Sequence, residues 1–257
     1  LCIYKGNTMK RTTLLLTALM SILLCSAQSL KIKRAEFEQW KNSSLKSEKF
    51  DSLPYRIAHI NDQSDSSPML VVWLHGGHSC GEDNSSHIGD NYGAVARLSV
   101  YLQSYNRNAI LVAPHLNEDM RNNTTAATVA LCRLIDHLIV SQGIDPTRVY
   151  LIGASFGGMM ATKVASARPD IPAAVEIIGT VPHIEATVPA QFAVCCVASD
   201  ADNPRKFERT ADQMYRLDSE GYKTLFVEYS GLSHRDICER GIDTKTLDWL
   251  FNHSRSR

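Results

Sequence analysis

The chain has 257 residues, of which 44% are hydrophobic, and its 27 basic side chains balance 27 acidic ones. This length and composition predict one domain with a sizeable core and argue against a second full domain. Without net positive charge or a stripe of lysine and arginine, nucleic-acid binding is not expected, because phosphate contacts need concentrated positive charge.

The first 27 residues have the pattern of upstream residues followed by a secretory signal peptide, Met9–Ala27. Lys10 and Arg11 precede an apolar stretch, Leu14–Leu24, and small residues follow at the cleavage point. The apolar stretch is too short to cross a bilayer comfortably. We therefore predict a secreted or periplasmic protein without a membrane span, with residues 1–8 outside the fold. A lipid anchor on Cys25 is the disfavoured alternative, because a bulky leucine precedes it.

The rest of the chain alternates predicted strands with predicted helices. Residues 28–52 are charged and serine-rich and predict a short helix and a linker, ahead of a main domain at 53–257. Alternation predicts an edge strand at 53–60, and apolar runs predict further strands at 69–74, 109–114, 149–152, 173–180, 192–198 and 223–229. Helices are predicted at 92–105, 124–142, 156–167, 205–219 and 244–252. This order predicts an α/β fold with a doubly wound, mostly parallel sheet and helices on both faces.

One stretch, VYLIGASFGGMM at 149–160, must end a strand, turn sharply and begin a helix. Its centre, Gly153–Gly157, fits the G-x-S-x-G nucleophile elbow, which lifts a serine hydroxyl out of strained backbone. Side chains at positions 153 and 157 would collide where strand and helix crowd together. Ser155 is therefore the candidate nucleophile, with a plain structural turn as the alternative.

A serine hydroxyl needs an imidazole to take its proton and a carboxylate to orient the imidazole. Two predicted strand ends downstream of Ser155 supply them, SDADN at 199–203 and SGLSH at 230–234. His234 is the candidate base, and His183 is more typical of a solvated loop. Asp202 is favoured over Asp200 as the acid, because by the third position beyond the strand end the chain has turned back toward the sheet.

An acyl-transfer serine also needs donors for the oxygen that becomes negative. The amide of Phe156 at the start of a helix is one candidate. The second is the amide of Gly77, because His75-Gly76-Gly77 follows a buried strand and lets backbone face the cavity.

Histidines in the same loop allow a different interpretation. His78 and His87 could bind a metal ion with Asp83 or Asp90, and a metal-dependent hydrolase using His75, His78 and His87 is a remote alternative. The loose spacing favours a polar pocket wall, so no metal site is predicted.

Together, LHGG after a buried strand, GEDN, IDPTRVYLIGASFGG and the late Asp and His resemble the α/β-hydrolase superfamily. The resemblance covers residues 53–252 and is to the secreted esterase and predicted-peptidase branch, which includes feruloyl esterases and polyhydroxybutyrate depolymerases. It implies that Ser155 is the nucleophile, Asp202 the acid and His234 the base, with Gly77 and Phe156 forming the oxyanion hole. Phe156 itself departs from the Met or Gln common in this branch.

The resemblance implies a serine hydrolase without a cofactor that cleaves carboxylic esters, either small molecules or esters linked to polysaccharides. A serine peptidase acting on short peptides shares the same triad and remains an alternative. A hydrolase-fold protein that binds without turnover is the alternative from another class.

Five cysteines follow the predicted signal peptide: Cys80, Cys132, Cys195, Cys196 and Cys238. The odd number leaves at least one thiol outside any pair within the chain. Cys195 and Cys196 lie in an apolar run and are expected as buried small hydrophobes. A Cys80–Cys238 disulfide is a hypothesis, since both lie in predicted loops of a protein expected to be secreted.

Overall fold

The computed structural model describes residues 3–4, 30, 33–62, 66–89 and 93–256. Its strands are β1 Ile3–Tyr4, β2 Lys46–Phe50, β3 Leu53–Ile60, β4 Met69–Leu74, β5 Ala109–Pro114, β6 Val149–Ala154, β7 Ala174–Ile178, β8 Ala193–Ser199 and β9 Thr224–Tyr229. Among the described residues these form one sheet of nine strands in the order β1-β9-β8-β7-β6-β4-β5-β3-β2. Neighbours from β9 to β5 are parallel, while β1, β2 and β3 pair antiparallel.

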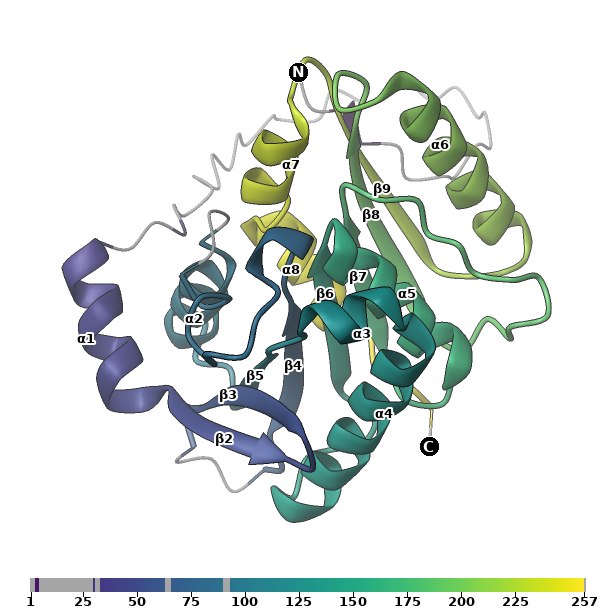
Figure 1. Ribbon diagram of the computed structural model, residues 1–257. Coiled ribbons are helices and arrows are strands. Elements are labelled where there is room, and N and C mark those ends of the chain that lie inside the picture. The colour runs from purple at the N-terminus through teal and green to yellow at the C-terminus, as the bar shows by residue number, and fades with distance from the viewer. Residues whose placement is uncertain (1–2, 5–29, 31–32, 63–65, 90–92, 257) are drawn as a thin grey trace, which may run out of the picture.

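Helices cover both faces of this sheet (Figure 1). They are α1 Arg34–Ser44, α2 Ala94–Ser104, α3 Glu118–Asn122, α4 Thr124–Ser141, α5 Phe156–Ala167, α6 Pro204–Ser219, α7 His234–Arg240 and α8 Thr244–Phe251, with a 3₁₀ turn, η1, at Gly77–Ser79. Helices α1, α2 and α8 contribute to the apolar core on one face. Helices α4, α5 and α6 contribute to the core on the other. The predicted doubly wound α/β architecture is confirmed.

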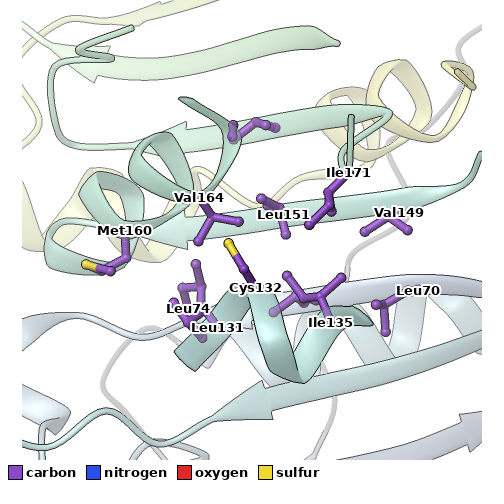
Figure 2. Packing of buried hydrophobic residues seen from close by; sticks show 14 of the residues in the cluster. Leu70, Leu74, Leu131, Cys132, Ile135, Val149, Leu151, Met160, Val164 and Ile171 are labelled. Carbon is purple, nitrogen blue, oxygen red and sulfur yellow. The ribbon is translucent and has the colours of Figure 1, made fainter. Parts of the chain in front are cut away.

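The central strands are buried on both faces, which explains their uninterrupted apolar sequence. All six residues of β4, β5 and β6 are buried. Figure 2 shows the core formed with α4 and α5, where Leu131 and Ile135 approach Leu74 and Leu70. Burying each such leucine contributes about 1.5–3 kcal/mol to stability. Helix α4 is long and apolar enough to span a membrane by composition, but its buried residues belong to this core.

The strand order reverses beside β4, and this determines where a site can form. From β4 the chain crosses through α2 to β5, and it then returns to form β6 on the other side of β4. In such sheets the crevice at the carboxyl ends of the strands, next to the reversal, is where ligands bind. The loop after β4 and the turn after β6 both lie at this edge.

The strands predicted within the main domain agree with the structure to within two residues at each end, but the amino-terminal part differs. The segment expected as a linker contains β2, which pairs with β3 across five residue pairs. Ile3 and Tyr4, expected outside the fold, pair with β9. Helix α7 was not anticipated, because its seven residues are too few to show a periodic apolar face. The predicted signal peptide, Met9–Ala27, lies outside the described residues.

Candidate active site

Ser155 sits in strained backbone between the end of β6 and the start of α5. Its φ of 55° and ψ of −117° are unusual for a residue with a side chain. The Ser155 amide donates to the Ile178 carbonyl of β7 at 2.8 Å, which holds the turn against the next strand. Strain of this kind persists only where the surrounding structure enforces it, as at a nucleophile elbow.

The two glycines that flank Ser155 permit close backbone approaches. A Cβ added at Gly153 would lie 2.3 Å from the Gly157 carbonyl oxygen. A Cβ at Gly157 would lie 1.9 Å from the carbonyl oxygen of Leu74, at the end of β4. The first collision is the predicted one between strand and helix. The second shows that Gly157 also lets α5 begin directly against the neighbouring strand.

The structure brings Ser155, His234 and Asp202 into one hydrogen-bonded line. The Nε2 atom of His234 lies 3.0 Å from Ser155 Oγ, and its Nδ1 atom lies 2.8 Å from Asp202 Oδ2. The Asp202 side chain is only 6% exposed, whereas that of His234 is 38% exposed. An imidazole held in this way has one nitrogen for a hydroxyl proton and the other fixed by a carboxylate.

Local structure positions both partners of Ser155. Asp202 lies in the turn between β8 and α6, where the Asn203 side chain caps α6. His234 is the first residue of α7, whose start is fixed by a capping box between Ser233 and Asp236. Gly179, with φ of 67°, leaves room for the imidazole, because a Cβ there would lie 3.1 Å from His234 Cε1.

The neighbouring acid, Asp200, has a different role. It accepts hydrogen bonds from the Ser230 hydroxyl and the Gly231 amide, both at 2.8 Å. These donors, the Gly231 amide first, lower the pKa of the exposed Asp200 carboxyl. Asp200 therefore holds the loop that leads to His234 through two hydrogen bonds, while Asp202 contacts the imidazole itself. His183, the other histidine considered, is exposed and lies near Arg209.

The two amides expected to bind an oxyanion lie at the starts of η1 and α5. The first amides of a helix have no partner within it. Neither the Gly77 amide nor the Phe156 amide donates to another group in the described part of the chain. Both residues begin their helices at the carboxyl edge of the sheet, after β4 and β6.

A cavity of about 520 Å³ opens beside Ser155. Ser155, Phe156 and Met159 line it from the elbow, and Gly179 and Thr180 follow from the end of β7. The remaining lining residues are Arg121, Asp202, Lys206 and His234. A small molecule held here could contact Ser155, His234 and both cations at once.

Comparisons with known proteins find similarity to esterases, although no protein-family profile matches the chain. The chain is 21% identical over 163 residues to feruloyl esterase B of Talaromyces funiculosus, covering 60% of this chain and 41% of that protein. It is 31% identical over 149 residues to "Putative esterase NocK" of Nocardia uniformis subsp. tsuyamanensis, covering 56% and 42%. It thus spans about two fifths of the length of either relative.

Among solved structures, a thermostable esterase superposes with a TM-score of 0.68 at 20% identity, covering 82% of this chain and 63% of that one. The chain has the α/β-hydrolase fold. The predicted resemblance to the esterases of this superfamily is confirmed, and the elbow and the Ser155–His234–Asp202 line lie at the fold's carboxyl edge.

The sequence patterns did not single out two cations that line this candidate site. Lys206 Nζ lies 2.5 Å from Asp202 Oδ2, 3.2 Å from the Gly179 carbonyl oxygen and 3.4 Å from His234 Nδ1. Its spacing of four residues from Asp202, at the start of a predicted helix, was a usable signal. Arg121 lies on α3, whose five residues are too few to show a periodic apolar face.

The histidines considered as metal ligands do not converge on a metal site. His75 and His87 are buried, with ring centroids 5.6 Å apart, but His78 is exposed. The third ring of the cluster belongs to His115, directly after β5, which stacks on His87 at 4.2 Å. Within the described residues, no three His, Cys, Asp or Glu side chains are arranged to hold a metal ion; Asp90 is not among them.

The hypothesis of a Cys80–Cys238 disulfide is wrong, because the structure does not join these thiols. Cys238 is buried on α7, with Sγ 3.9 Å from His234 Nε2. Cys80 is half-buried after η1, where desolvation and Glu118 raise the pKa of its thiol. Cys195 and Cys196 are fully buried in β8, as expected, and burial raises the pKa of both thiols.

Proposed function

We propose that the chain is a secreted serine hydrolase that cleaves carboxylic esters through an acyl-enzyme on Ser155. The observation that carries this proposal is the line from Ser155 Oγ through the His234 imidazole to Asp202, with contacts of 3.0 and 2.8 Å. The strained elbow and the adjoining cavity support it, as do the two esterase relatives.

In the acylation step, Ser155 Oγ attacks the ester carbonyl carbon while its proton passes to His234 Nε2. Asp202 holds the Nδ1–H and stabilises the imidazolium that forms. The carbonyl oxygen becomes negative and takes hydrogen bonds from the amides of Gly77 and Phe156. The carbon–oxygen bond to the alcohol then breaks, and His234 returns the proton to the leaving oxygen.

Deacylation repeats this sequence with water as the nucleophile. His234 takes a proton from a water molecule, and the resulting hydroxide adds to the carbonyl carbon of the acyl-enzyme. The same two amides receive the negative oxygen. When the bond to Ser155 breaks, His234 returns the proton to Oγ, so a carboxylic acid leaves and the resting enzyme is restored.

The substrate class is proposed only as broadly as the relatives allow. Esterase relatives support a small-molecule or saccharide-linked ester. We propose deacylation of polysaccharides as one form of this activity, consistent with a cavity that is open and has no long apolar lid among the described residues.

Ser155→Ala tests the mechanism. We expect it to abolish turnover of a short-chain nitrophenyl ester and labelling by a fluorophosphonate probe. Ser166→Ala is the matched control, because Ser166 lies on the same helix and does not line the cavity. Undiminished labelling of Ser155→Ala would refute the role of Ser155.

Secretion is a separate proposal with its own test. It rests on the pattern of Met9–Ala27 and predicts a mature amino terminus at Gln28. Amino-terminal sequencing of the protein recovered outside the cytoplasm should begin at or near that residue. An intact Met9–Ala27 segment on the exported protein would contradict the proposed cleavage.

A further inference from the structure

Two cations, Lys206 and Arg121, line the cavity beside Ser155, and they differ in how strongly each is paired with a carboxylate. Lys206 Nζ is 2.5 Å from the Asp202 carboxylate, which is nearly buried. Its charge is therefore already paired within the Ser155–His234–Asp202 line. Arg121 approaches the cavity from α3, on the side of η1.

The Arg121 guanidinium is paired only weakly. Among the described residues, its ion pair is with Glu118, one turn earlier on α3, and both carboxylate oxygens are 3.4 Å from Nη1. The two side chains are 48% and 60% exposed. Exposed pairs of this kind contribute about 0–1 kcal/mol, so Glu118 competes little with another anion.

The guanidinium also lies against the proposed oxyanion loop. A Cβ added at Gly77 would lie 3.3 Å from Arg121 Cζ and 3.4 Å from both Nε and Nη2. Cζ is the closest of these atoms, so the flat face of the guanidinium lies against position 77 and its edges are left to bind a carboxylate through two parallel hydrogen bonds. The glycine at position 77 leaves room for the guanidinium beside the loop whose amide is proposed to receive the substrate's carbonyl oxygen.

The charges that line the cavity favour an anionic ligand. Arg121 and Lys206 contribute two positive charges and Asp202 one negative charge, so the lining is positive by one when His234 is neutral. A cleft with one excess charge attracts ligands of the opposite sign and raises their local concentration. Because Lys206 is paired with Asp202, Arg121 is the cation that can bind a ligand.

We propose that Arg121 binds a carboxylate carried by the ester substrate and thereby selects esters whose acyl or alcohol part is acidic. This inference rests on the proposed ester hydrolysis at Ser155. The cavity of about 520 Å³ holds Arg121 and Ser155 in one space, so a single small substrate can contact both. Arg121 is then a specificity residue that no sequence motif reveals.

The test compares matched acidic and neutral esters. The acyl-side pair is the nitrophenyl monoester of adipic acid and nitrophenyl hexanoate. The alcohol-side pair is 4-acetoxybenzoate and 4-acetoxybenzamide. In the wild-type protein, kcat/KM should favour the acidic member of at least one pair. Arg121→Met should lower that acidic-to-neutral ratio by up to about fivefold, because the guanidinium is half-exposed and exposed ion pairs contribute about 0–1 kcal/mol.

Three further variants sharpen the ratio. Arg121→Lys keeps the charge but loses the planar fork, so it should retain part of the preference. Glu118→Gln removes a weakly competing carboxylate and should raise the ratio by a few fold at most. Arg133→Met is the matched control, because Arg133 pairs with Asp51 and does not line this cavity; its ratio should equal that of the wild type.

An unchanged ratio in Arg121→Met would overturn the proposal. Equal losses on acidic and neutral esters would overturn it too, since they would assign Arg121 to supporting the Gly77 loop. If Arg121→Met does not fold by circular dichroism, Arg121→Lys decides, and a wild-type ratio in that variant overturns the fork contact.

A binding measurement separates this proposal from the proposed activity. Calorimetry of Ser155→Ala with monomethyl adipate should show binding that the Ser155→Ala, Arg121→Met double variant loses. If the wild type hydrolyses no ester and takes no fluorophosphonate label, the proposed function fails, while this difference in binding still supports the carboxylate site. Equal binding by both proteins would overturn the site.

Discussion

Two sets of histidines in this molecule, His234 at the cavity and the buried cluster of His75, His87 and His115, have hydrogen-bond partners that differ in kind. The closest partners of the His234 ring nitrogens are the side chains of Ser155 and Asp202, and the side chain is 38% exposed at the cavity. His75 and His115 are buried, and the closest partners of their ring nitrogens are backbone groups at 2.9–3.0 Å, although Ser86 Oγ also lies 3.4 Å from His115 Nε2 and Asp83 Oδ1 lies 3.6 Å from its Nδ1. The comparison teaches that the partners of an imidazole, rather than its place beside a site, show whether it can exchange a proton.

His75 and His115 stay neutral because each accepts a hydrogen bond from a backbone amide. His75 Nε2 accepts from the Leu116 amide at 3.0 Å, and His115 Nδ1 accepts from the Asn84 amide at 3.0 Å. A protonated ring could not accept either bond. The other nitrogens bond to the carbonyls of Gly76 and Ser79, so this cluster braces the loop that carries Gly77.

The largest expected effect is on kcat, and it comes from changing Asp202, the partner of His234. Asp202→Asn should reduce kcat by about 10⁴-fold, because an amide that donates to Nδ1 favours the tautomer unable to accept the Ser155 proton. Steady-state kinetics with a nitrophenyl ester measures the loss. Circular dichroism and the melting temperature should confirm that the variant is folded. A folded Asp202→Asn with wild-type kcat would mean that Asp202 does not orient His234.

The next effect is the dependence of stability on pH, which comes from the buried cluster. Burial lowers the pKa of His75 to about 4 and of His87 to about 2, from an ordinary value of 6.5. Below pH 6.5 the unfolded chain therefore binds protons that the folded chain does not. Stability should fall with decreasing pH by about 1.4 kcal/mol per pH unit for each histidine. Above pH 6.5 both states are neutral, and the contribution is constant.

His87→Leu isolates this contribution. His87 Nε2 donates to the Ala113 carbonyl at 3.0 Å, while its buried Nδ1 has no hydrogen-bond partner among the described residues. Urea unfolding between pH 6 and pH 4 should give a slope of stability against pH that is lower by about 1.4 kcal/mol per unit in the variant. Equal slopes in both proteins would show that His87 protonates in the folded state.

The sequence predicts the residues around Ser155 and His234 well and the buried histidine cluster poorly, and the reason is physical. The elbow can be recognised from consecutive residues. Ser155 has strained backbone, and the close approaches at positions 153 and 157 require glycine on both sides of it. His115 meets His75 only through the pairing of separate strands, so no local pattern shows the cluster. Arg121 depends in the same way on how α3 lies over η1. The choice between Asp200 and Asp202 rested on a turn geometry that only the fold displays.

His75→Phe should show a smaller effect, on stability. Phenylalanine keeps a ring but leaves the Leu116 amide without its partner, whereas the Gly76 carbonyl still accepts from the Ser79 amide at 3.1 Å. The cost of an unsatisfied buried group predicts a loss of about 1–3 kcal/mol in the free energy of unfolding. His78→Phe is the matched control, since His78 is exposed on the same loop. Equal stabilities of these two variants in urea unfolding would show that the His75 bonds contribute nothing.

Asp200→Asn should have the smallest effect on catalysis. It tests whether the neighbouring acids Asp200 and Asp202 have different roles. Asp200 bonds to Ser230 and Gly231 and not to an imidazole. Asparagine keeps one accepting oxygen, so the loop before His234 loosens without being lost. We expect kcat/KM to fall by a few fold at most, measured on the nitrophenyl ester used for Asp202→Asn. A loss comparable to that of Asp202→Asn would show that the position of His234 depends as strongly on the loop held by Asp200 as on the Asp202 carboxylate.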